Sequence, residues 1–272
     1  MEKRLILRGL LAGAVGGVLA FVFARILAEP LIQQAIDYED GRSHALGEGH
    51  EHEIFSRAIQ ENVGIGAALI LFGVAMGALF AVAYAICLGR VGRIRARPLA
   101  LLVAAAAFTG VFLVPFLKYP TNPPAVGNDA TIGLRSSLYL VLTGASVVLM
   151  ILATWLGRRL QPRFGTWNAA LLAVGAYALA IGILFVLLPN LGDLDANKEL
   201  GQSTETPPPL LDSSGKIIFP GFPADLLYEF RLYAAGAQLL MWTAIGLVFG
   251  ASAERLLERP RVAERPVAVT PA

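Results

Sequence analysis

Long apolar stretches alternate with shorter polar ones along most of this chain. Six stretches are close to the length of about 20 apolar residues that a helix needs to cross a hydrocarbon layer of about 30 Å. Continuous apolar runs predict helices, because the strands of a membrane barrel alternate apolar and polar positions. The sequence therefore predicts an all-α integral membrane bundle with spans at residues 5–27, 62–88, 98–117, 136–156, 168–188 and 230–251.

The predicted spans form one transmembrane domain over residues 1–254, and two connections within it are long. Residues 29–61 include "PLIQQAIDYED", whose apolar spacing predicts a short helix. Residues 189–229 are rich in proline, glycine and serine, which favours an irregular loop. We expect residues 255–272 to be a disordered tail. The first span is longer than the apolar core of a secretion signal, so we expect it to stay as an anchor.

Basic residues are concentrated in every second connection, and this pattern predicts how the spans are oriented in the membrane. Fourteen of the 22 lysines and arginines fall on one side of the predicted spans, against only four of the 20 acids. Excess lysine and arginine marks the cytoplasmic side, so both termini are predicted to be cytoplasmic and the long connections to form an acidic extracytoplasmic cap. The 14 basic residues are Lys3, Arg4, Arg8, Arg90, Arg93, Arg95, Arg97, Arg158, Arg159, Arg163, Arg255, Arg259, Arg261 and Arg265.

Composition narrows the function classes. The chain is 56% hydrophobic and 15% charged, with a mean hydropathy of +0.63, which is typical of a plasma-membrane protein whose main partner is the bilayer and which binds no nucleic acid. The predicted spans contain almost no ionisable residues, which argues against a proton or ion path lined by acids. We find no phosphate-binding loop and no nucleophile–base arrangement, so we expect no enzyme activity, no catalytic residue and no bound cofactor.

Small residues recur at four-residue intervals in the first two spans. Gly9, Gly13 and Gly17 follow this spacing, as do Gly73 and Gly77. Glycines at this spacing let helix backbones approach closely within a membrane. We predict ordinary packing between helices of one chain, with a dimer face as the alternative.

All three histidines lie in one segment, "HALGEGHEHE", at residues 44–53. Imidazole suits cobalt, nickel, copper and zinc, and interleaved carboxylates add neutralising charge. The spacing matches no compact zinc motif, so a solvated acidic loop is the competing interpretation. The candidate metal ligands are His44, Glu48, His50, Glu51, His52 and Glu53.

A proline-rich joint, "VPFLKYPTNPPAVGNDATIGLRSSLY", connects the third and fourth spans. Pro115 is expected to kink or break the third helix near its outer end, which frees backbone carbonyls. Lys118, Arg135 and Arg231 are predicted at the outer boundary, and Arg25 has a similar place at the end of the first span. They form either a ring of ion pairs with Glu29, Asp129, Asp225 and Glu229 or the rim of a substrate vestibule.

Four segments together resemble the CbtA family of predicted cobalt transporter subunits. They are the glycine-rich first span with "LAEPLIQQAIDYE", the His/Glu segment, the proline-rich joint, and "FPADLLYEFRLYAAGAQLLMW" at the sixth span. The resemblance covers about residues 5–250 and is most specific at the joint and at Phe230, Arg231 and Leu232. It implies a membrane subunit for cobalt uptake, often accompanied by a small CbtB-like partner with one membrane helix. Descriptions of the family often give five spans, whereas the charge alternation here favours six.

The resemblance implies that the His/Glu segment faces the metal and that the joint shapes the outer mouth. We therefore expect uptake of a divalent transition metal, most simply Co²⁺. Two alternatives stay open: a transporter of an anionic solute, and a protein with a structural or assembly role. The residues implied at the mouth are Lys118, Tyr119, Asn122, Arg135 and Arg231.

Overall fold

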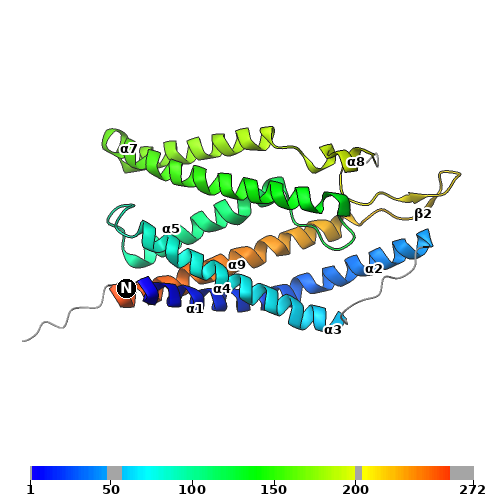
Figure 1. Cartoon of the computed structure of the whole chain (residues 1–272), viewed down its shortest axis with the longest axis horizontal. Coiled ribbons are helices and arrows are strands. Elements are labelled where there is room, and N and C mark those ends of the chain that lie inside the picture. The colour runs from blue at the N-terminus through cyan, green and yellow to red at the C-terminus, as the bar shows by residue number, and fades with distance from the viewer. Residues whose placement is uncertain (1, 48–56, 200–203, 258–272) are drawn as a thin grey trace, which may run out of the picture.

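Helices dominate the structure, a computed structural model that describes residues 2–47, 57–199 and 204–257 (Figure 1). The predicted all-α class is confirmed. In the described residues the elements are α1 (Glu2–Phe23), η1 (Ala24–Ala28), α2 (Glu29–Leu46), α3 (Arg57–Ile59), η2 (Gln60–Gly64), α4 (Ile65–Cys87), α5 (Ala96–Ala107), η3 (Phe108–Leu113), α6 (Val114–Lys118), η4 (Asp129–Thr131), α7 (Ile132–Leu187), η5 (Leu191–Asp193), α8 (Asp195–Glu199), β1 (Leu210–Leu211), β2 (Ile217–Phe219) and α9 (Ala224–Leu257).

Five helical stretches of the described chain are long and apolar enough to cross a membrane. The sequence predicts six spans, and two of them, 136–156 and 168–188, fall in one stretch. The five stretches are Glu2–Leu46, Glu61–Cys87, Ala96–Lys118, Asp129–Glu199 and Ala224–Leu257.

The chain of α7 folds back on itself at Gly165, where φ is 74° and ψ is 167°. Figure 1 shows the two resulting arms side by side. The hydroxyl oxygens of Ser146 and Tyr177, on opposite arms, lie 2.7 Å apart, and Leu142 and Ile181 share one apolar cluster. Each of the two predicted spans therefore has its own arm of an antiparallel hairpin.

Replacing Gly165 with alanine is expected to lower the stability of the hairpin by about 1–3 kcal/mol, because side chains other than glycine rarely adopt this backbone conformation. The melting temperature in detergent measures the effect. Gly175→Ala, on the second arm with open space around it, is the matched control and should melt no lower than the wild type. Equal melting temperatures for the two variants would contradict the fold of α7.

The glycines of the first two spans face each other within one chain. A Cβ added at Gly13 would lie under 3.0 Å from the carbonyl oxygen of Gly73, and Gly9 and Gly77 meet in the same way. The backbones of antiparallel α1 and α4 therefore touch, as expected where lipid removes the hydrophobic drive for helix association. The prediction of packing within one chain is confirmed.

The core of the bundle lies between α1, α4, α5 and α9. Tyr84 and Phe249 are fully buried there, with ring centroids 4.9 Å apart. Arg8 donates a hydrogen bond to the carbonyl of Ser252. These contacts bring the start of α1 and the end of α9 to one end of the bundle, together with the turn after α4 and the turn at Gly165 (Figure 1). The described arginine-rich segments thus gather at one end.

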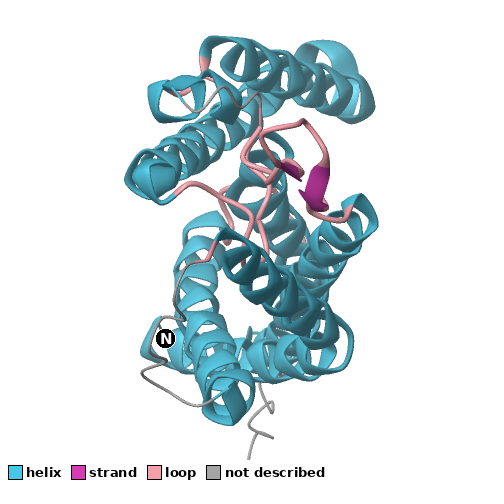
Figure 2. Cartoon of the chain, turned by 90° about the vertical axis from the view of Figure 1, so that its right-hand side faces the viewer, coloured by secondary structure: helices cyan, strands magenta, loops and turns pink. Residues whose placement is uncertain are grey.

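The opposite end carries α2, α3, α8 and the hairpin of β1 and β2 (Figures 1 and 2). Helix α2 continues from α1 through the π-helical turn η1, so the predicted short helix is 18 residues long. Tyr38 on α2 packs on Phe222 and donates a hydrogen bond of 3.0 Å to the carbonyl of Pro220. The segment that the sequence predicts as irregular thus has helical turns and a small hairpin anchored on α2.

Helix geometry changes before Pro115, as the sequence predicts. The regular helix α5 passes into the π-helical η3, and Pro115 lies in α6, so helical geometry continues through the proline without a break. Both η3 and α6 pack against α7. The continuous stretch Ala96–Lys118, with its π-helical turn, therefore connects the bundle to the α7 hairpin.

Candidate functional site

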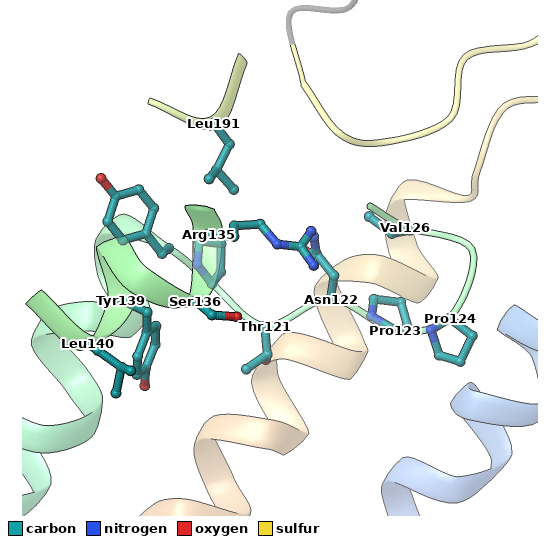
Figure 3. A pocket seen from close by; sticks show the side chains of 12 residues that line it. Thr121, Asn122, Pro123, Pro124, Val126, Arg135, Ser136, Tyr139, Leu140 and Leu191 are labelled. Atoms are coloured by element: carbon teal, nitrogen blue, oxygen red, sulfur yellow. The ribbon is translucent and has the colours of Figure 1, made fainter. Parts of the chain in front are cut away.

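A cavity of about 760 Å³ lies where the proline-rich joint meets the start of α7 (Figure 3). Its walls combine proline rings with hydroxyl, amide and guanidinium groups. The lining residues are Tyr119, Pro120, Thr121, Asn122, Pro123, Pro124, Val126, Arg135, Ser136, Tyr139, Leu140 and Leu191. We call this space the joint cavity.

The structure brings the predicted vestibule residues together around the joint cavity. Tyr119, Asn122 and Arg135 line it. Arg231, from α9, donates hydrogen bonds of 2.7 Å to the side-chain oxygen of Asn122 and 3.2 Å to the carbonyl of Thr121. Lys118 lies beside the cavity and donates to Asn190 at 2.6 Å. Arg231 of α9 is therefore linked to the cavity through Thr121 and Asn122, which line it.

The partners of these cations differ from those that the sequence suggested. Lys118 and Arg231 bind neutral oxygens in the described part of the chain. Arg135 forms an ion pair of 2.5 Å with Glu205. The predicted pairing with Asp129, Asp225 and Glu229 is therefore wrong for these three cations. The reason is that oxygens of the joint and of the segments after α7 and α8 lie within hydrogen-bond distance of these cations instead.

Glu205 is the main residue of this site that sequence reasoning missed. Its side chain is 2% exposed. It accepts hydrogen bonds from Arg135 at 2.5 Å, Thr131 at 2.6 Å and Asn197 at 3.3 Å. Burial raises the pKa of the Glu205 carboxyl, but these donated hydrogen bonds and the charge of Arg135 outweigh burial and hold the pKa below its usual value. Its surroundings in the sequence, "TETPPP", give no hint of burial.

A second cavity, of about 250 Å³, lies on the other side of the Arg135–Glu205 pair. Arg135 lines the joint cavity and Glu205 lines the second one. Gly127 also lines the second cavity, and its N–H donates to the carbonyl of Glu205 at 3.1 Å. The ion pair is therefore part of the partition between the two spaces. The second cavity is lined by Glu39, Arg42, Ser43, Leu46, Ala125, Gly127, Glu205 and Pro207.

The predicted metal ligands are only partly within the described chain. His44 is exposed in the last turn of α2, next to Ser43 of the second cavity. Glu48, His50, Glu51, His52 and Glu53 lie outside the described residues. Among the residues that are described, no group of three or more histidine, cysteine or acidic side chains could hold a metal ion.

Acidic side chains also line a cavity of about 530 Å³ between α2 and the start of α9. Asp37, Asp225 and Glu229 contribute their carboxylates, and no basic residue lines this space. All three are exposed. This end of the molecule therefore presents exposed negative charge between α2 and α9.

Long apolar helices with polar cavities at one end define a multi-pass integral membrane protein. The large aliphatic side chains that the α7 hairpin exposes, such as Leu140 and Val186, are suited to lipid. The chain belongs to the family described as "Probable cobalt transporter subunit (CbtA)", whose model matches residues 2–254. The resemblance found in the sequence is confirmed, and membership in a family of transporter subunits implies partner proteins. Neither the curated proteins nor the solved structures include one that matches this chain.

Proposed function

We propose that this protein is the membrane subunit through which a cobalt uptake system admits Co²⁺, and that residues 44–53 capture the ion outside the cell. Both termini are cytoplasmic in this proposal, and each arm of α7 is one span. The protein has no enzymatic step of its own. The proposed partner is a small protein with a single membrane helix, and the proposed driving force is the membrane potential.

The position of His44 carries this proposal. His44 begins the imidazole-rich segment, and its neighbours Ser43 and Leu46 line the second cavity. An ion held by the segment is therefore delivered beside Glu39 and Glu205, which line that cavity. The mixed nitrogen and oxygen ligand set suits a first-row transition metal.

The charges around the cavities are compatible with a cation. Glu205 neutralises Arg135, and the acidic cavity at Asp37, Asp225 and Glu229 lies at the same end of the bundle. A surface of one charge sign raises the local concentration of the opposite ion.

Replacing His44, His50 and His52 together with alanine is expected to lower cobalt uptake about tenfold or more, because loss of metal-site side chains weakens binding by at least that factor. Intracellular cobalt is measured in cells that lack this protein and carry wild-type or variant chain at equal membrane levels. The matched control replaces Ser213 and Lys216, exposed at the same end, and should keep wild-type uptake. Normal uptake by the histidine variant would contradict capture by this segment.

An anionic solute is the second candidate, and the donors in the joint cavity favour it. Arg135, Asn122 and Ser136 present N–H and O–H groups to that space. An anion carrier would lose its transport in Asn122→Ala and keep it in the histidine variant. If cobalt uptake depends on the histidines, the result favours the metal over the anionic solute as the transported species.

A further inference from the structure

Glu29 is a buried carboxylate at the start of α2, and its side chain is 4% exposed. One of its oxygens, Oε1, accepts a hydrogen bond from the guanidinium of Arg57. The other oxygen, Oε2, is buried and has no hydrogen-bond partner among the described residues. A buried carboxylate oxygen without a donor is costly, because water would otherwise solvate it.

The groups that face Glu29 come from three other elements. Arg57 is the first residue of α3, and its Nε also donates to Gln33 at 3.0 Å. Arg25 of η1 and Glu61 of η2 form a second ion pair of 3.4 Å beside the first. The two carboxylates and two guanidiniums have no net charge when all four are ionised.

The other charged side chains on elements around α2 line the acidic cavity and do not face Glu29. Asp225 and Glu229 of α9 are exposed and line the acidic cavity with Asp37, away from the buried face of α2. The part of β2 that packs on α2 contributes the apolar Phe219. The balance of charge at Glu29 is therefore set by Arg57, Arg25 and Glu61.

The backbone around this cluster departs from the regular helix on both sides. The π-helical turn η1 ends directly before Glu29, and η2, also π-helical, contains Glu61. Such turns are often found at functional sites, because they re-aim side chains within a helix. Together they place both carboxylates at the junction of α1, α2, α3 and α4.

We propose that Glu29 is a proton-binding site, and that a proton on Oε2 breaks the ion pair between Glu29 of α2 and Arg57 of α3. Protonation turns the free oxygen into a neutral hydroxyl, so it removes the burial penalty of the charge. It also removes the charge that holds Arg57. A divalent cation fits this position less well than a proton, because two guanidiniums already lie beside the carboxylates. The proposal goes beyond cobalt uptake and does not depend on it.

Infrared difference spectra of the full chain in lipid nanodiscs, recorded as the pH is stepped, test this proposal. A protonated carboxyl group gives a carbonyl stretch that a carboxylate lacks. We expect one such band from a water-shielded carboxyl, and we expect Glu29→Gln to lose it. Asp212→Asn, which changes a carboxylate hydrogen-bonded to Ser214 in the β1–β2 turn, is the matched control and should keep the band.

Substitutions at Arg57 and Glu61 should move the pH at which this band appears in opposite directions. Arg57→Gln removes the favourable charge, so the band should appear at higher pH. Glu61→Gln removes a repelling charge, so it should appear at lower pH. A band that survives in Glu29→Gln, or a midpoint that neither neighbour moves, would overturn the proposal. The Glu61 variant decides the matter alone if the Arg57 variant does not fold, and a failure of cobalt uptake would leave the band unchanged.

Discussion

Replacing Gly13 with leucine is expected to prevent α1 and α4 from packing, with a cost of more than about 3 kcal/mol. A Cβ at this position would lie under 3.0 Å from the backbone of Gly73, and a backbone cannot rotate away as a side chain can. Helix α1 also packs against α9, so the separation would disturb the core around Phe249. Size-exclusion chromatography in detergent should show most of the variant protein as aggregate.

The control for this substitution is Gly175→Leu. Gly175 lies in the second arm of α7, and nothing would come within 4 Å of a Cβ there. The same change of residue in another apolar helix should therefore give monodisperse protein with a wild-type melting temperature. If Gly13→Leu is as monodisperse as Gly175→Leu, then α1 and α4 do not cross at the glycines.

Glu205→Ala is expected to destabilise the end of the protein that carries α8 by about 3–5 kcal/mol, because it leaves the largely buried guanidinium of Arg135 without its countercharge. Thr131 and Asn197 would lose their acceptor as well. Glu254→Ala is the control, since its partner Arg97 has a side chain that is 56% exposed. An exposed pair contributes about 1 kcal/mol or less. Similar melting temperatures for the two variants would show that the Glu205 contacts do not form.

The carboxylate of Glu205 should also make the stability of the folded protein depend on pH. The pKa of Glu205 is lower in the folded protein than its ordinary value. Its stabilising contribution is therefore complete above the ordinary carboxyl pKa and is lost as the pH falls through the lowered value. The melting temperature of the wild type should fall on acidification over that range. The melting temperature of Glu205→Gln should fall by a smaller amount.

The helices could be predicted from the sequence because each depends on local composition. Runs of apolar residues fixed the spans, the glycine intervals marked the α1–α4 contact, and Pro115 marked the change of helix geometry before α6. The fold of α7 was predicted through Arg158, Arg159 and Arg163, whose charges separate two apolar runs. These signals need no knowledge of distant partners.

The polar contacts could not be predicted in the same way. Glu205 and Arg135 are 70 residues apart, and no periodicity connects them. The sequence predicts an ion pair between Glu29 and a cation at the outer boundary. In the structure Glu29 is buried and pairs with Arg57, which is 28 residues further along the chain. Tyr119, Asn122 and Arg135 line one cavity, as neighbours in the joint can, but the ion-pair partner of Arg135 depends on how the segment after α8 folds. All six candidate metal ligands, His44 included, stay a prediction.

Labelling of two engineered cysteines in intact cells tests most directly whether the histidine-rich end takes cobalt from outside. The variants are Ala45→Cys, beside His44, and Arg93→Cys, in the turn after α4, and both positions are exposed. In each variant serine replaces Cys87, the single native cysteine. We expect a membrane-impermeant thiol reagent to label position 45 in intact cells and position 93 only after the cells are broken. Labelling of position 93 alone in intact cells would place the histidines in the cytoplasm and contradict capture from the medium.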